Sequence, residues 1–129
     1  MAGATERRFR SREAALRFYF RTSELLAPNA KPGVFSKGRP RKIGKGSNVI
    51  RDFLSLDYCF HGMNDEQLWL LQTFYAPGGF GAKQRPVAEV FEVAQREFPK
   101  SGWTLQRVAR FRHDALLIFE EQLRRQRLI

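Results

Sequence analysis

The chain has 129 residues and carries 23 lysines and arginines against 13 aspartates and glutamates, a formal net charge of +10. Because 43% of the residues are hydrophobic and 12 are phenylalanine, there is enough apolar material for a packed core, and wholesale disorder is excluded. The single cysteine, Cys59, excludes an internal disulfide, and no apolar run approaches the roughly 18 residues that cross a bilayer, so we expect a reducing, cytoplasmic compartment and no membrane partner.

The first predicted element is a helix over residues 11–26, within a basic N-terminal region 1–27. Ser11 is a suitable N-cap, and Pro28 prevents the helix from continuing. Apolar and small side chains recur at helical spacing and predict the face that packs on the core: Ala15, Leu16, Tyr19, Phe20, Thr22, Leu25 and Leu26.

Residues 28–48 form a segment of different composition, with three prolines, four glycines, six lysines or arginines and no acid. Glycine and proline at this density predict an extended or turning, solvated backbone. Residues 1–48 as a whole hold 12 basic and three acidic residues, a net charge of +9, whereas residues 49–129 hold 11 and 10, a net charge of +1. Such an asymmetry is typical of a nucleic-acid-binding arm attached to a nearly neutral body.

Residues 49–129 predict a domain of four further helices. Their starts carry recognisable signals: Ser47 or Asn48 as a cap, Asn64 with Gln67 as a capping box, Pro86 at a first helical position, and Thr104 as a cap. The expected ranges are 49–60, 64–75, 86–98 and 104–126, with Phe98 and Leu105 among the residues on the inner faces. No segment alternates as a strand does, so the fold class is all-α, a helical bundle.

Catalytic and metal sites are not predicted. Neither His61 nor His113 has a second ligand type at metal spacing, and nothing pairs a nucleophile with a base. The loop PGGFGAK (residues 77–83) lacks the Ser or Thr that follows the lysine of a phosphate-binding loop. We therefore expect no enzyme, no cofactor and no metal.

The last two helices, residues 86–126, are a candidate helix-turn-helix. In such a motif the first turns of the second helix face double-stranded DNA, where arginine pairs with guanine or phosphate and glutamine pairs with adenine. The residues expected on that face are Thr104, Gln106, Arg107, Arg110, Arg112 and His113. The alternative is an ordinary solvated helix surface.

A second candidate lies at residues 36–42, where Gly38-Arg39-Pro40 resembles the core of an AT-hook that lies in the minor groove of A·T-rich DNA. The cations expected to contact nucleic acid or a polymerase channel are Lys37, Arg39, Arg41, Lys42 and Lys45. The alternatives are a solvated basic linker and a segment that follows RNA.

The C-terminal half resembles a known pattern in three stretches, Asp65–Tyr75, Pro86–Val90 and Thr104–Leu116. Over about 65 residues it is similar to region four of bacterial sigma factors, and more so to the phage late-gene regulators and antiterminators built on that module. The gene-transfer-agent activating factors of alphaproteobacteria are similar in size and layout. The sequence departs from the pattern by about seven extra residues between the last two helices.

This resemblance implies a nucleoid-associated, DNA-binding transcription regulator that acts with RNA polymerase and its sigma factor, as an antitermination factor or an activator. It also implies a possible contact between the basic segment and nascent RNA. Two alternatives remain: an AT-hook-like architectural protein and an RNA-binding adaptor.

Overall fold

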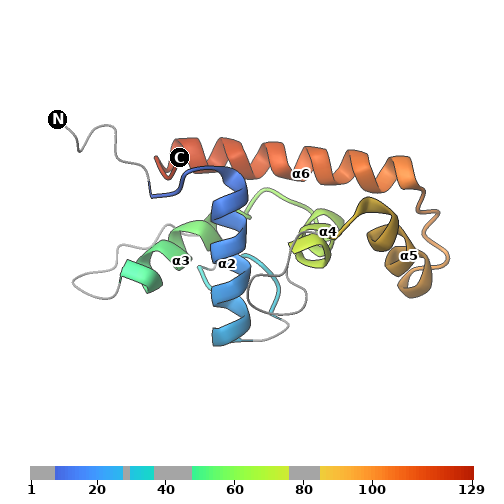
Figure 1. The fold of residues 1–129 in the computed structure, drawn as a ribbon, viewed down its shortest axis with the longest axis horizontal. Coiled ribbons are helices and arrows are strands. Elements are labelled where there is room, and N and C mark those ends of the chain that lie inside the picture. Colours follow the sequence, from blue (N-terminus) through green and yellow to red (C-terminus); the bar gives the residue numbers. More distant parts are fainter. Residues whose placement is uncertain (1–7, 28–29, 37–47, 76–84) are drawn as a thin grey trace.

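Five helices make up the secondary structure of the part of the chain that the computed structural model describes, residues 8–27, 30–36, 48–75 and 85–129. Their bounds are α2 Arg12–Leu26, α3 Asn48–Tyr58, α4 Asp65–Tyr75, α5 Val87–Glu97 and α6 Leu105–Arg125 (Figure 1). Those ranges contain no strand, which confirms the all-α class. No described helix is both long and apolar enough to cross a membrane.

Helices α2, α4 and α6 begin directly after the capping residues that the sequence indicated. Asn48, one of the two caps predicted for α3, is instead its first helical residue, and the other, Ser47, lies outside the described residues. Ser11 Oγ accepts a hydrogen bond from the Ala14 amide at 3.2 Å. Asn64 and Gln67 exchange two bonds, at 2.8 and 3.0 Å, and so form a capping box. Pro86 is the N-cap of α5, with an extended ψ of 153°, so the helix begins at Val87, one residue later than predicted.

Two hydrophobic cores lie along α6, which at 21 residues is roughly 31 Å long. The first core joins α2, α3 and the C-terminal half of α6, with Tyr19, Phe53 and Phe119 fully buried. The second joins α4, α5 and the N-terminal half of α6 around Phe74 and Val108. Helix α4 contributes to both cores, so it lies between them (Figure 1).

Several side chains predicted to face the core are exposed instead. Leu25 and Leu26, at the end of α2, are 66% and 50% exposed. Phe98 is 41% exposed because it is the C-cap of α5, and its non-helical backbone takes it out of the helical register. Leu105 is 49% exposed, and the buried position at that corner belongs to Trp103, which precedes the helix.

Residues 30–36 fold onto the body and do not continue as an extended arm. The buried carboxylate of Asp57 on α3 accepts hydrogen bonds from the amides of Gly33 and Ser36, at 2.8 and 2.6 Å, and from the Tyr19 hydroxyl at 2.5 Å. The Phe35 ring packs edge-on against Phe53 with a centroid distance of 5.0 Å. Residues 37–47 are therefore flanked on both sides by residues of the folded body.

Candidate nucleic-acid interface

The helix pair formed by α5 and α6 is joined by seven residues, Phe98–Thr104. Helix α4 packs against both, so the three helices surround the second core. The connection contains one tight turn, in which the Ser101 amide donates to the Phe98 carbonyl at 3.0 Å. Gly102 follows it with a φ of +68°, a left-handed conformation that glycine adopts without a Cβ clash. The connection is longer than the three or four residues typical of helix-turn-helix motifs.

Four of the six predicted contact residues on α6 are exposed together at its N-terminal half: Thr104, Gln106, Arg110 and His113. Thr104 Oγ1 caps the helix by accepting a hydrogen bond from the Arg107 amide at 3.0 Å. Gln106, Arg110 and His113 are three or four positions apart, so their side chains lie along one face of the helix. Among the residues that the structure describes, none of these three side chains has a hydrogen-bond or ion-pair partner. Their polar groups are free to bind an external partner.

The Arg107 side chain makes contacts within the chain. Its guanidinium donates to Glu66 at 2.9 Å and to the Ser101 carbonyl at 2.6 Å. The same group lies over the Trp103 ring, 4.4 Å from the centroid. Arg107 therefore ties the α5–α6 connection to the first turn of α4, and its charge is already paired with a carboxylate.

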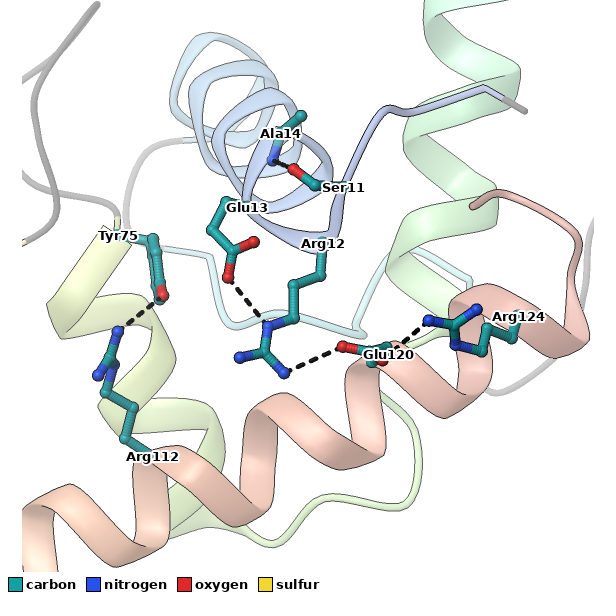
Figure 2. A network of polar contacts seen from close by, with 8 residues as sticks. All are labelled: Ser11, Arg12, Glu13, Ala14, Tyr75, Arg112, Glu120 and Arg124. Atoms are coloured by element: carbon teal, nitrogen blue, oxygen red, sulfur yellow. Dashed lines mark hydrogen bonds and ion pairs between the residues drawn. The ribbon is translucent and has the colours of Figure 1, made fainter. Parts of the chain in front are cut away.

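Arg112 points toward α4, away from the exposed face. Its guanidinium lies 4.9 Å from the Phe74 ring centroid and donates a long hydrogen bond of 3.4 Å to the Tyr75 hydroxyl (Figure 2). Its Nε atom is buried without a hydrogen-bond partner. Cation–π contact over a buried ring stabilises the interface between α4 and α6, so the structure gives this arginine a packing position.

Polar contacts at the other end of α6 hold α2 in place (Figure 2). Arg12 contacts Glu13 at 2.9 Å and Glu120 at 3.0 Å, and Arg124 shares Glu120 at 3.1 Å. The hydrogen bond to Glu13 raises the pKa of Arg12, so its charge is retained at any physiological pH. Arg8 is likewise paired, with Asp52 at 3.3 Å.

Cations without a partner remain on several exposed surfaces of the described chain. They are Arg10, Arg17, Arg21, Lys31, Arg96, Lys100, Arg110 and Arg127. Arg17 and Arg21 are one turn apart on the outer side of α2. The predicted basic contacts Lys37, Arg39, Arg41, Lys42 and Lys45 lie outside the described residues.

The buried Asp57 cluster was not predicted as a site, although a signal existed. Asp57 follows Phe53 by four positions and precedes Phe60 by three, so helical spacing places it on the apolar face of α3. Burial and the Asp57 charge raise the pKa of Tyr19, which keeps its hydroxyl a donor. Ser36 Oγ lies 3.2 Å from His61 Nε2, but Ser36 is only 1% exposed. The cluster is buried, and its hydrogen bonds hold the 30–36 turn against α2 and α3.

Metal-ligand geometry is missing from the described residues, which contain no group of three or more His, Cys, Asp or Glu side chains able to hold an ion. Comparison of the chain with protein-family models, with curated proteins and with solved structures finds no match.

Proposed function

We propose that the protein is a DNA-binding transcription regulator that acts with RNA polymerase, as an antitermination factor or an activator, and that α6 is its DNA-recognition helix. The observation that carries this proposal is the exposed set Gln106, Arg110 and His113 on one face of a capped helix, with no partner among the described residues. Arginine and glutamine are the side chains that most readily make paired hydrogen bonds to guanine and adenine edges.

The internal contacts of Arg107 and Arg112 divide the six predicted residues into two groups. Arg107 and Arg112 position the helix, because their guanidinium groups contact α4 and the connection before α6. Thr104, Gln106, Arg110 and His113 are the residues that we expect to contact DNA.

Binding to double-stranded DNA, measured by fluorescence anisotropy on sites selected from a random library, tests this assignment. Arg110→Ala is expected to cost about 1–3 kcal/mol on the selected site and to relax the base preference at one position. A matched control is Arg125→Ala on the same helix, about 22 Å away along its axis. Equal weakening by both variants, on all sequences, would contradict base recognition by Arg110.

We propose that the basic segment adds affinity for DNA without sequence preference, because lysine and arginine side chains attract phosphates whatever the base sequence. Deleting residues 28–48 would remove the Gly33 and Ser36 amides that Asp57 binds, so it would disturb the fold as well. Replacing Lys37, Arg39, Arg41, Lys42 and Lys45 with glutamine keeps the segment's length. If all five cations meet duplex phosphates, the slope of log affinity against log salt should fall in magnitude by roughly 4. An unchanged slope would exclude that use of the segment.

The polymerase partner is supported by the sequence resemblance and is tested separately. Purified chain and RNA polymerase holoenzyme are mixed after nuclease treatment and analysed by size-exclusion chromatography. Co-elution that persists in the five-glutamine variant supports a protein contact made by the helical body. If the chain and the polymerase elute separately, the polymerase part of the proposal is wrong and only DNA binding remains.

A further inference from the structure

One end of the molecule concentrates arginine side chains. The segment that leads into α2 lies beside the residues that follow α6, and the Phe9 amide donates a hydrogen bond to the Leu128 carbonyl at 2.9 Å (Figure 1). Residues 8–13 and 120–129 together carry six basic and three acidic side chains, a net charge of +3. The basic side chains are Arg8, Arg10, Arg12, Arg124, Arg125 and Arg127. These two segments form the arginine end of the molecule.

The arginine end holds most of the net charge of the described chain. The described residues as a whole carry 16 basic and 12 acidic side chains, a net charge of +4. Asp52 on α3 also contacts Arg8, but the adjacent Arg51 balances that acid, so the surplus at this end stays at +3. A surface that concentrates charge of one sign attracts a partner of the opposite sign.

Acidic side chains orient several of these arginines without using up their donors. Arg12 donates to Glu13 at 2.9 Å and to one oxygen of Glu120 at 3.0 Å, and Arg124 donates to the other oxygen at 3.1 Å (Figure 2). A guanidinium group has five N–H donors, so each keeps donors for an external acceptor. The Arg124 and Arg125 side chains are both 66% exposed. Ion pairs at such exposure are weak and exchange readily for a stronger partner.

An open hollow of about 460 Å³ lies between the start of α2 and the end of α6. Arg10, Arg12 and Arg124 line it, so guanidinium groups reach it from both segments of the arginine end. Arg10 has no partner among the described residues, and neither has Arg127, two residues after the end of α6. Planar guanidinium groups that approach from two segments suit the oxygens of a phosphate group.

The arginine end faces the same way as the residues proposed to read DNA. Arg124 follows Gln106 by 18 residues, which is five full turns of α6. Both side chains are exposed, so they project from the same side of the helix, about 27 Å apart along its axis. That separation corresponds to about eight base pairs of duplex.

The chemistry of the surface favours a duplex over other polyanions. The arginine end exposes no large hydrophobic side chain, so it offers neither an apolar anchor for a lipid bilayer nor an aromatic platform for unpaired bases. Double-stranded DNA carries one negative charge per about 1.7 Å of its axis on a stiff backbone. It therefore presents several phosphates at once and loses less conformational entropy on binding than a flexible acidic peptide does.

We propose that the arginine end binds the sugar–phosphate backbone of double-stranded DNA without base preference, with a phosphate held in the hollow between Arg10, Arg12 and Arg124. The proposal rests on the proposed binding of DNA but not on base recognition by α6. The arginine end would hold phosphates that flank the bases read by Gln106 and Arg110, and so lengthen the bound site.

Fluorescence anisotropy with a labelled duplex that lacks the selected site tests the proposal. The double variant Arg10→Gln/Arg127→Gln removes two cations that have no partner among the described residues, and urea unfolding should show unchanged stability. If both cations meet duplex phosphates, the slope of log affinity against log salt should fall in magnitude by roughly 2. Affinity at 0.1 M salt should fall about fivefold or more. Arg10→Lys/Arg127→Lys keeps both charges and should retain the wild-type slope.

The matched control is Arg21→Gln/Arg96→Gln, which removes two exposed, unpaired cations from α2 and α5 and should leave the slope nearly unchanged. Equal changes in the two glutamine variants would overturn the proposal, because the effect would then follow total charge. An unchanged slope in Arg10→Gln/Arg127→Gln would also overturn it.

Two further probes test the rival partners: a labelled hexaglutamate peptide, and vesicles of phosphatidylserine and phosphatidylcholine. Binding of either probe that is lost in Arg10→Gln/Arg127→Gln, while the slope with duplex is unchanged, would overturn the proposal and assign the surface to an acidic protein or a membrane. Failure of base recognition by α6 has a different signature, an unchanged base preference in Arg110→Ala on the selected site. The duplex used here lacks that site, so the two failures are distinguishable.

Discussion

Replacing Asp57 with alanine tests how the 30–36 turn is held on the helical body. In the structure both carboxylate oxygens are engaged: one accepts from the Tyr19 hydroxyl and the Gly33 amide, and the other accepts from the Ser36 amide. Asp57 has no exposed surface, so water does not replace these bonds unless the turn opens. Alanine removes the carboxylate that accepts from three buried donors, and only the Gly33 amide keeps a second, longer contact, to the Tyr19 hydroxyl at 3.4 Å.

The magnitude follows from those three donors. Each buried donor that loses its partner costs about 1–3 kcal/mol, so the sum is about 3 kcal/mol or more. Removal of the carboxylate also removes the cost of keeping a charge out of water, which favours the lower end of the range. A domain of this size is stabilised by roughly 5–15 kcal/mol, so the loss is large without abolishing folding in every case.

Urea unfolding followed by circular dichroism measures the effect, and a loss of about 3 kcal/mol should lower the midpoint by roughly 1–3 M. The companion variant Tyr19→Phe removes one donor while Asp57 keeps both amides, so it should cost about 1 kcal/mol. In that variant the Gly33 and Ser36 amides should stay protected from hydrogen exchange, whereas in Asp57→Ala they should exchange rapidly. A loss below about 1 kcal/mol for Asp57→Ala, with both amides still protected, would refute the reasoning.

Three further outcomes are expected. Phe119→Ala should destabilise the fold by about 3–5 kcal/mol in urea unfolding because Phe119 is fully buried, whereas Phe98→Ala should cost under about 1 kcal/mol; similar losses would contradict the burial pattern. Burial raises the pKa of the Cys59 thiol to about 12, whereas a cysteine in the unfolded chain has a pKa of about 8.5. The stability that the buried neutral thiol contributes is therefore fully present below about pH 8.5 and is lost as the pH rises toward 12. The free energy of unfolding should therefore fall by up to about 1.4 kcal/mol per pH unit in that window, and Cys59→Ala should remove this part of the slope. Gly33→Ala should cost about 1–2 kcal/mol, since a φ of +93° strains any side chain while the added Cβ meets only ordinary contacts; an unchanged midpoint would contradict this.

Helix positions were predictable because the signals that start and end helices are local. Ser11, Asn64 with Gln67, and Thr104 each bind amides within three residues of themselves. These interactions form in the same way wherever the helix later packs. The all-α class and the limits of the five described helices, to within two residues at each end, follow from such short-range contacts and from the spacing of apolar residues.

The exposure of helix ends was predicted less well, for a geometric reason. Periodicity states which side of a helix is apolar, but it does not state how far the neighbouring helices extend. Leu26 and Leu105 lie on apolar faces that no described neighbour covers, and Phe98 leaves the helical register at a C-cap. Only the packed arrangement decides such positions.

The amino-acid sequence by itself determined that this is a basic, helical chain whose positive charge is concentrated near residues 28–48, with polar side chains on one face of its last helix. The tertiary structure alone decided which arginines of that helix are free. Arg107 and Arg110 are both plausible contacts by spacing, yet Glu66, 41 residues away in the chain, pairs with Arg107 and leaves Arg110 exposed. The physical reason is that a charge is neutralised by whatever group the fold brings within a few ångströms of it, and sequence order does not specify that distance.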